Sequence, residues 1–379
     1  MKRWHAQKHQ ICKLIAGGIG GVLCYLAVVK TIPFVSPVLA QTALFSASVS
    51  FGFDTEAVLA GSGDADPLDE QVQTSGDSVE TAPEESADST EESSSEQTET
   101  ASLDDQTLQK PENAGTIVRQ QYKGGGSGTY IPLAHGYIKN STNVSTETIQ
   151  QTIAQKPAFS IIADGKTPEV LIMHSHATES YQPGIYDWFD PSFPSRNRDT
   201  SKNMCRVGAE IKAQLVAAGI GVIQDETLHD YPSYTGSYER SAQTVKSYLE
   251  KYPTIKVVLD VHRDAIQPAN DRMIAPATTI NGKPCAQVMI ISGADDGTMN
   301  MPNYLENLKL SAALQNQMEA DYPTLTRPVM FSYRKYNQDL TTGSILLEMG
   351  GHANSLAEAV YCGELVGKSL AKTLLSLKG

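Results

Sequence analysis

Val170-Leu-Ile-Met-His-Ser-His-Ala-Thr-Glu-Ser-Tyr181 begins with four apolar residues and continues into two histidines and a glutamate. The apolar run predicts a buried strand that ends just before His174. Imidazoles and carboxylates are residues that bind zinc in proteins. His176 and Glu179 have the spacing His-x-x-Glu, so one tight turn can aim both side chains at the same point. This stretch therefore predicts a strand that leads directly into part of a metal site.

Two later apolar runs end in the same way. One is Val257-Val-Leu-Asp-Val261, followed at once by His262, and the other is Ile345-Leu-Leu347, followed by Glu348. In an open α/β sheet, ligands and chemistry collect outside the carboxyl ends of the strands. We therefore expect the three runs to be neighbouring strands that assemble one site from distant parts of the chain.

Apolar strands alternate along the chain with amphipathic helices. This alternation predicts an α/β fold with a mainly parallel sheet flanked by helices. The expected helices are 146–154, 207–218, 241–252, 303–322 and 356–377, and the expected strands are 170–173, 221–223, 257–261, 287–292 and 344–349. Residues 182–203 are polar and contain three prolines, which predicts a long loop near the site.

The composition divides the chain into three parts. Residues 1–40 begin with basic residues and continue into an apolar run. Residues 41–115 become rich in Ser, Thr and Glu from about residue 61. Residues 116–379 have the composition of a globular domain. We expect a cytoplasmic tip with a membrane-targeting segment, then a disordered acidic linker, then a catalytic α/β zinc hydrolase domain.

The targeting segment has two interpretations. It is a cleaved signal peptide, with Val38-Leu-Ala40 as the cleavage site, or an uncleaved single-pass anchor. The run Leu14–Val29 is shorter than the ~20 residues that a spanning helix needs, but continuing through Lys30 makes it long enough. We favour the anchor. Either interpretation places the folded domain outside the cytoplasm, and the anchor would hold it at the cell membrane.

The negative charge of the chain lies almost wholly in the linker. Residues 61–114 contain 16 acidic residues and one lysine, a net charge of −15, whereas the whole chain carries −13. The remainder is thus close to neutral, and it shows no basic patch of the kind that nucleic-acid binding requires. None of the five cysteines forms a Cys-x-x-Cys pair, so neither a thiolate zinc site nor a redox motif is expected.

His176, Glu179 and His262 are the expected zinc ligands. His174 is a further candidate, because residues i and i+2 of an extended segment point to the same side. Asp260 or Asp264 is expected to accept the other ring N–H of His262 and to fix its tautomer. The alternatives are that His262 is an ordinary core histidine and that Glu179 only orients an imidazole.

Glu348 is expected to act as the general base, since a carboxylate in so apolar a strand is costly unless it is paired or used. Arg263 is the second catalytic candidate, polarising a substrate carbonyl or holding a substrate carboxylate. The alternatives are a structural ion pair between Glu348 and Arg263 or Arg334, and a plain ion pair between Arg263 and Asp264.

These motifs together resemble the stage II sporulation protein P family. The resemblance covers roughly Ile161 to the C-terminus and rests on five stretches in the same order: 174–181 (His-Ser-His-Ala-Thr-Glu-Ser-Tyr), 236–241 (Gly-Ser-Tyr-Glu-Arg-Ser), 260–264 (Asp-Val-His-Arg-Asp), 336–340 (Tyr-Asn-Gln-Asp-Leu) and 347–351 (Leu-Glu-Met-Gly-Gly).

The resemblance implies a zinc-dependent N-acetylmuramoyl-L-alanine amidase that acts on peptidoglycan, with peptide cross-links as a second target, in the engulfment step of sporulation. It implies stage II sporulation proteins D and M as partners at the septal and engulfing membrane. The domain is also similar to the broader zinc amidases of the phosphorylase/hydrolase-like fold, an alignment that places the first ligand at His176. Those amidases take their ligand Glu from a later helix start, where this chain has no Glu near Asn203.

Two other functions fit the same residues. One is a membrane-anchored binding or scaffold protein of the cell wall whose hydrolase fold lacks chemistry. The other is a zinc carboxypeptidase acting on stem peptides, suggested by His-x-x-Glu with a later His and Glu.

Overall fold

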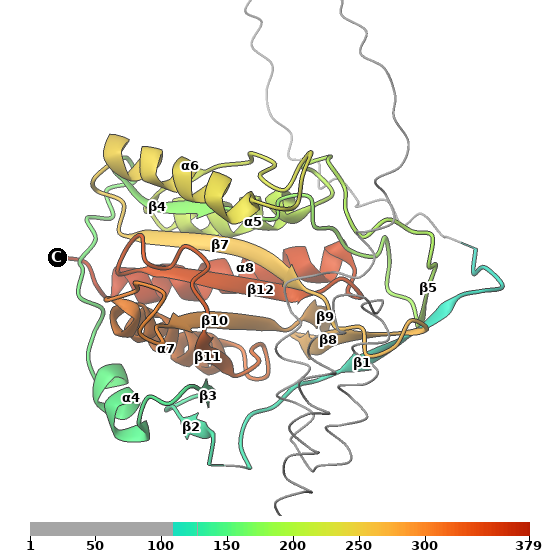
Figure 1. Ribbon diagram of the computed structural model, residues 1–379, viewed down its shortest axis with the longest axis horizontal. Coiled ribbons are helices and arrows are strands. Elements are labelled where there is room, and N and C mark those ends of the chain that lie inside the picture. Colours follow the sequence, from blue (N-terminus) through green and yellow to red (C-terminus); the bar gives the residue numbers. More distant parts are fainter. Residues whose placement is uncertain (1–108, 127) are drawn as a thin grey trace, which may run out of the picture. The chain divides into compact units, whose positions relative to one another are not determined.

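The computed structural model describes residues 109–126 and 128–379 (Figure 1). All of them belong to one compact unit, Glu91–Gly379. The expected membrane segment and almost all of the expected linker lie outside the described residues and stay predictions. Within the described part of the chain, no helix has both the length and the apolar character that a membrane span needs.

Eight strands form the main sheet, in the order β2-β3-β11-β10-β12-β7-β4-β6. Five of its neighbouring pairs are parallel, and only β2–β3 and β10–β12 are antiparallel. The expectation of a mainly parallel α/β sheet is therefore confirmed. The strands are β2 (Tyr130–Pro132), β3 (Tyr137–Ser141), β4 (Pro168–Met173), β6 (Gly221–Gln224), β7 (Val257–Asp264), β10 (Val288–Ala294), β11 (Val329–Tyr333) and β12 (Ser344–Gly351).

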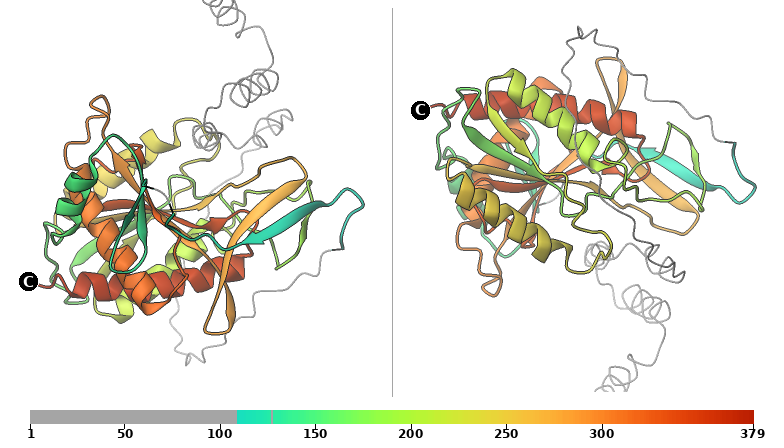
Figure 2. Two further views of the ribbon diagram at one scale, coloured as in Figure 1. Left: turned by 90° about the horizontal axis from the view of Figure 1, so that it is seen from below. Right: turned by 90° about the horizontal axis from the view of Figure 1, so that it is seen from above.

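Helices cover both faces of this sheet (Figures 1 and 2). The five helices that the structure describes are α4 (Thr146–Ile153), α5 (Met204–Ala217), α6 (Ser237–Lys251), α7 (Tyr304–Asp321) and α8 (Leu356–Leu375). Apolar residues of α5, α7 and α8 share one large core with one face of the sheet, whereas α6 packs on the opposite face. All five were expected, and their ends differ from the expected ones by a few residues.

The strand β4 shows how the sequence produces these two layers. Val170 and Ile172 belong to the large core, and Leu171 and Met173 belong to the smaller core under α6. Successive side chains of a strand point to opposite faces, so four consecutive apolar residues are what a strand buried on both faces requires.

A second sheet of four strands, in the order β5-β1-β8-β9, was not expected. It contains β1 (Gly115–Gln120), β5 (Trp188–Phe189), β8 (Arg272–Ile280) and β9 (Lys283–Ala286). The pairing of β5 with β1 ties the otherwise irregular segment 182–203 to this sheet. The expected loop is thus largely confirmed, with one short strand inside it.

Candidate metal centre

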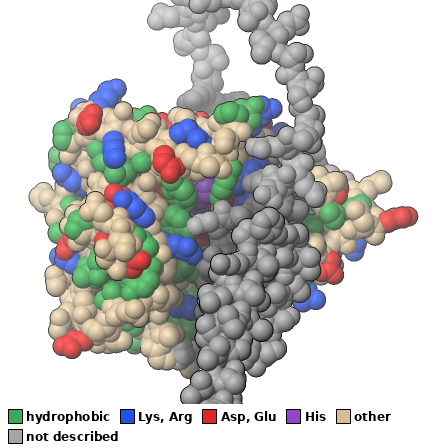
Figure 3. Space-filling view, in the orientation of Figure 1, with side chains coloured by type: hydrophobic (Ala, Val, Ile, Leu, Met, Phe, Trp, Pro, Cys, Tyr) green, Lys and Arg blue, Asp and Glu red, His purple; other side chains and the backbone are tan. Residues whose placement is uncertain are grey.

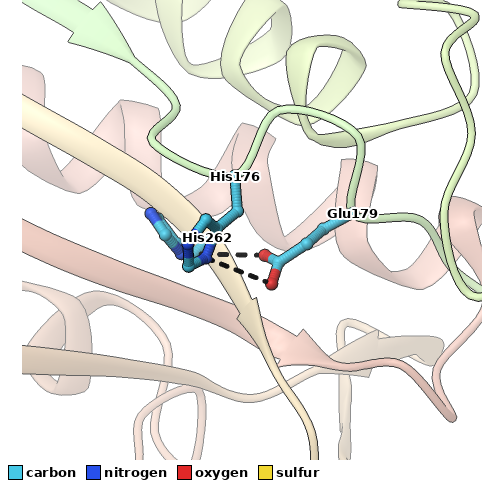
Figure 4. A group of neighbouring side chains, drawn as sticks. All are labelled: His176, Glu179 and His262. Atoms are coloured by element: carbon cyan, nitrogen blue, oxygen red, sulfur yellow. Dashed lines mark ion pairs between the residues drawn. The ribbon is translucent and has the colours of Figure 1, made fainter. Parts of the chain in front are cut away.

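The predicted site residues lie on or just after the neighbouring strands β4, β7 and β12. His176 and Glu179 lie on the turn that follows β4, and His262 lies on β7, between β4 and β12. Glu348 on β12 is the register partner of His262. Parallel neighbouring strands therefore bring together residues that are far apart in the sequence, as Figure 4 shows for the two histidines and Glu179.

His176, Glu179 and His262 form a group that could hold a metal ion. One ligand atom from each lies within 4.8 Å of the others, and all three residues are buried. The Nδ1 atom of His176 is 3.7 Å from Oε1 of Glu179, and the Nδ1 atom of His262 is 3.7 Å from Oε2. Two ligands of a tetrahedral zinc ion lie about 3.4 Å apart, so both spacings are close to the geometry that zinc prefers.

The second nitrogen of each imidazole is occupied by a hydrogen-bond partner. Nε2 of His176 is 3.1 Å from the Oγ of Ser237. Nε2 of His262 is 2.8 Å from Oδ1 of Asp260 and 2.7 Å from the Oγ of Ser175. Such outer partners fix the tautomer and the orientation of a metal-binding histidine. Both Nδ1 atoms are thereby left facing the Glu179 carboxylate.

Asp260, and not Asp264, forms the hydrogen bond with the ring of His262. Asp264 lies at the end of β7 and forms an ion pair of 2.7 Å with Arg327. Burial lowers the pKa of His262, but the Asp260 and Glu179 carboxylates outweigh burial and raise that pKa to about 9. Asp260 in turn accepts hydrogen bonds from the backbone N–H and the hydroxyl of Ser175, which hold its carboxylate in place.

Glu179 is held as a carboxylate. Burial favours its neutral form, but Arg263 and the two histidines outweigh burial and hold its pKa below the usual range. The backbone N–H of Arg263 donates a 3.2 Å hydrogen bond to Oε2. Two imidazoles and an ionised carboxylate are a donor set of the kind that catalytic zinc sites use, so these residues fit a zinc ion.

Glu348 has different partners and a different charge environment from Glu179. Its Oε2 atom is buried and has no hydrogen-bond partner in the described structure, although the residue as a whole is partly exposed. Burial, and after it the Asp264 carboxylate, raise the pKa of Glu348 to about 8, whereas His262 lowers it. The neighbouring Glu179 and Glu348 therefore differ in charge state, which is the pattern expected of a ligand beside a proton-transfer group.

His174 does not join the group. Its Nδ1 atom lies 2.9 Å from the carbonyl oxygen of Val261, and its ring packs against Gly208 of α5. Burial lowers its pKa to about 4 and keeps the ring neutral. The argument that His174 and His176 point to the same side assumed an extended segment, but the chain turns directly after β4.

The guanidinium of Arg263 contacts backbone carbonyls. Its Nε donates to the carbonyl of Ser180 at 2.7 Å, and its Nη2 donates to the carbonyl of Ser195 at 2.9 Å. Arg263 is almost fully buried. These contacts tie Ser180 and the segment 182–203 to β7, so the geometry supports a role in shaping the site. The predicted contact of Arg263 with substrate stays a prediction.

Ser237, Ser175 and two tyrosines near the site were not predicted as functional residues. Tyr234 stacks on His176 with ring centroids 4.6 Å apart, and Tyr238 meets the same ring edge-on at 5.2 Å. The density of tyrosine and hydroxyl groups in 231–241 is visible in the sequence. That density does not distinguish a site wall from an ordinary loop, and only the fold brings the segment to His176.

Comparison with known proteins decides the family. The sequence matches the family described as Stage II sporulation protein P (SpoIIP) over residues 54–371. The chain belongs to this family. The stage II sporulation protein P of Bacillus subtilis (strain 168) is 31% identical over 231 residues, which cover 58% of this chain and 54% of that protein. The match thus spans about half the length of this relative.

Two of the solved structures that resemble the chain are amidases. The N-acetylmuramoyl-L-alanine amidase AmiC2 of Nostoc punctiforme matches with a TM-score of 0.34 and 11% identity, over 56% of this chain and 97% of that one. The CwlD amidase from Clostridioides difficile, in complex with the GerS lipoprotein, matches with a TM-score of 0.33 and 13% identity, over 55% and 98%.

Proposed function

We propose that the chain is a zinc-dependent peptidoglycan hydrolase that cleaves the amide between N-acetylmuramic acid and the L-alanine of the stem peptide. The observation that carries the proposal is the convergence of His176, Glu179 and His262 on one point, with Glu348 on the neighbouring strand. Membership of a sporulation family supports a role in remodelling the cell wall during engulfment.

His176 and His262, through Nδ1, and the Glu179 carboxylate would hold the zinc ion. A zinc ion at this position supplies a Lewis acid that polarises the amide carbonyl and lowers the pKa of a water molecule. Asp260 and Ser237 keep the two imidazoles oriented, through the hydrogen bonds to their Nε2 atoms. Arg263 holds the loop above the site through the carbonyls of Ser180 and Ser195.

Glu348 would move the proton. Its unpartnered Oε2 atom accepts a proton from the attacking water, whose oxygen bonds to the lactyl carbonyl carbon. The bond from that carbon to the alanine nitrogen then breaks, and Glu348 passes the proton to the leaving nitrogen. Without a metal ion, the raised pKa of Glu348 favours its neutral form. A divalent cation nearby would lower that pKa and favour the carboxylate form, which can accept the proton.

The remaining expectations are part of the same proposal. The chain is held at the cell membrane by its N-terminal segment, with the described domain outside the cytoplasm, and it works with stage II sporulation proteins D and M. Cleavage of peptide cross-links is a second activity of the same site.

Digestion of purified peptidoglycan followed by mass spectrometry tests the reaction. We expect glycan strands without peptides together with intact stem peptides, and we expect a chelator to abolish both products. Loss of a single terminal residue from the stem peptide would instead indicate a zinc carboxypeptidase. Unchanged peptidoglycan in the presence of zinc would indicate a scaffold protein without this chemistry.

A further inference from the structure

The start of α6 and the residues just before it contact the ring of His176. Tyr234 stacks on one face at 4.6 Å with an interplanar angle of 29°, and Tyr238 meets the ring edge-on at 5.2 Å and 72°. Ser237, between them in the sequence, places its Oγ 3.1 Å from Nε2. Three side chains within five residues of one segment therefore contact a single imidazole.

The contact with Ser237 determines which ring atom faces Glu179. Turning the ring by 180° about its bond to Cβ would put carbon atoms where both nitrogens now lie. Nε2 would lose Ser237, and Nδ1 would leave its position 3.7 Å from Glu179. The hydrogen bond therefore stabilises the one ring orientation in which His176 and Glu179 can bind the same metal ion.

Tyr238 also supports the second histidine. Its ring lies nearly parallel to that of His262, at 12° with centroids 6.4 Å apart. On Tyr238 stacks Tyr336, at 5.2 Å and 19°. The amide of Asn337 donates to the backbone carbonyl of Tyr238 and to the Oγ of Ser241, at 3.0 Å each. The start of α6 is therefore held against β7 by the turn that carries Tyr336.

The backbone of that turn adopts a strained conformation. Tyr336 and Asn337 have φ angles of 43° and 57°, in the left-handed region that non-glycine residues rarely adopt. Gln338 fixes it to β10, because its Oε1 accepts from the N–H of Gly293 at 2.8 Å and its Nε2 donates to the carbonyl of Ile291 at 3.0 Å. Backbone strain of this kind persists only where the surroundings determine the conformation, and it gathers at functional sites.

We propose that Tyr234, Ser237 and Tyr238 are positioning residues that hold the imidazoles of His176 and His262 with Nδ1 toward Glu179, and that they thereby set the metal affinity of the site. The proposal rests on the zinc site proposed above. Their contacts with the site are made to the two imidazoles, so their effect on the reaction is expected to pass through the histidines.

Zinc affinity, measured by competition with a chromophoric chelator, tests the proposal independently of peptidoglycan hydrolysis. We expect Ser237→Ala to weaken zinc binding about 10- to 100-fold, and we expect Ser237→Thr to restore most of it, since the threonine hydroxyl can make the same hydrogen bond. Tyr238→Leu should weaken binding, whereas Tyr238→Phe, which keeps the ring, should bind nearly as well as the natural chain. Ser247→Ala, at an exposed position of the same helix, is the matched control.

The visible spectrum of the cobalt-substituted protein provides a second reading, because it changes with the geometry of the ligands. An altered spectrum in Ser237→Ala, restored in Ser237→Thr, supports the proposal. Zinc affinities and cobalt spectra that are the same in Ser237→Ala, Tyr238→Leu and the natural chain would overturn it. A natural chain that binds no zinc would instead overturn the proposed function.

Folding of each variant is checked by circular dichroism and thermal unfolding. If Ser237→Ala does not fold, Tyr234→Ala replaces it, because Tyr234 is only partly buried and its truncation leaves the core intact. We expect folded Tyr234→Ala to bind zinc about threefold or more weakly, since a stacking partner of His176 is lost. Unchanged affinity in this variant would likewise contradict the proposal.

Discussion

At the scale of single residues, the site separates two glutamates by their surroundings. Glu179 faces two imidazoles and accepts a hydrogen bond from the backbone N–H of Arg263, and the nearby positive charges hold its pKa below the usual range. Glu348 has a buried oxygen without a hydrogen-bond partner, and burial with the Asp264 charge raises its pKa to about 8. These surroundings suit the proposed roles, in which Glu179 would be an anionic ligand and Glu348 would carry the proton.

Glu348→Gln separates metal binding from proton transfer. The amide keeps the size of the side chain but cannot accept the proton, so we expect hydrolysis to fall about 100- to 10,000-fold while zinc remains bound. Release of stem peptides and the zinc content of the purified variant are measured together. Glu250→Gln, at an exposed position of α6, is the control. Normal hydrolysis by Glu348→Gln would remove this residue from the mechanism.

Asp260→Asn tests which aspartate supports His262. Asp260 contacts Nε2 of His262, whereas Asp264 pairs with Arg327. We expect Asp260→Asn to weaken zinc binding about 10- to 100-fold, because the imidazole loses its charged partner. Asp264→Asn should leave zinc affinity within a few-fold of the natural chain. The reverse order of the two affinities, measured by chelator competition, would contradict this assignment.

At the scale of secondary structure, the strands with continuous apolar runs could be predicted and the irregular ones could not. β4, β7, β10 and β12 are buried on both faces, and their sequences show it. β1, with the sequence Gly-Thr-Ile-Val-Arg-Gln, alternates only weakly, and β5 has two residues. These short strands exist because distant segments pair with them, which a local pattern does not reveal.

The site was predictable to the extent that its residues follow predicted strands. His176, Glu179, His262 and Glu348 all come at or just after an apolar run, and the fold brings them together. Ser237 could not be selected in the same way, since it lies at the start of a helix on a different layer. The error about the direction of His174 arose because the sequence does not show where β4 stops being extended.

The end of β12 depends on a glycine. Gly350 has a φ of 77°, and a Cβ atom there would lie 2.7 Å from the Cβ of Ala286 and 2.7 Å from the Oδ1 of Asn354. We expect Gly350→Ala to lower the free energy of unfolding by about 1–3 kcal/mol, through strain and crowding. Chemical denaturation measures the loss. Gly128→Ala, where a Cβ meets nothing within 4 Å, should change stability by much less. Equal stabilities would contradict the steric explanation.

At the scale of the whole molecule, the metal site links segments that lie far apart along the chain. The turn after β4 supplies His176 and Glu179, and β7 supplies His262. A ligand that binds only the folded state stabilises that state in proportion to the logarithm of its concentration relative to Kd. Zinc is therefore expected to contribute to the stability of the described domain as well as to its chemistry.

Thermal unfolding with and without zinc measures this contribution. At a zinc concentration about 100 times Kd we expect stabilisation of about 2.7 kcal/mol, seen as a rise in Tm. In His262→Ala the rise should disappear, because one of three ligands is missing. A similar rise in the variant and in the natural chain would show that zinc binds elsewhere.

We propose that one zinc ion lies between His176, Glu179 and His262. Anomalous diffraction from zinc-soaked crystals, measured on both sides of the zinc absorption edge, tests it most directly. We predict one strong peak within about 2.0–2.2 Å of the Nδ1 atoms of both histidines and of a Glu179 oxygen. A peak bound elsewhere, or no peak at this position, would show that these three residues do not form the zinc site.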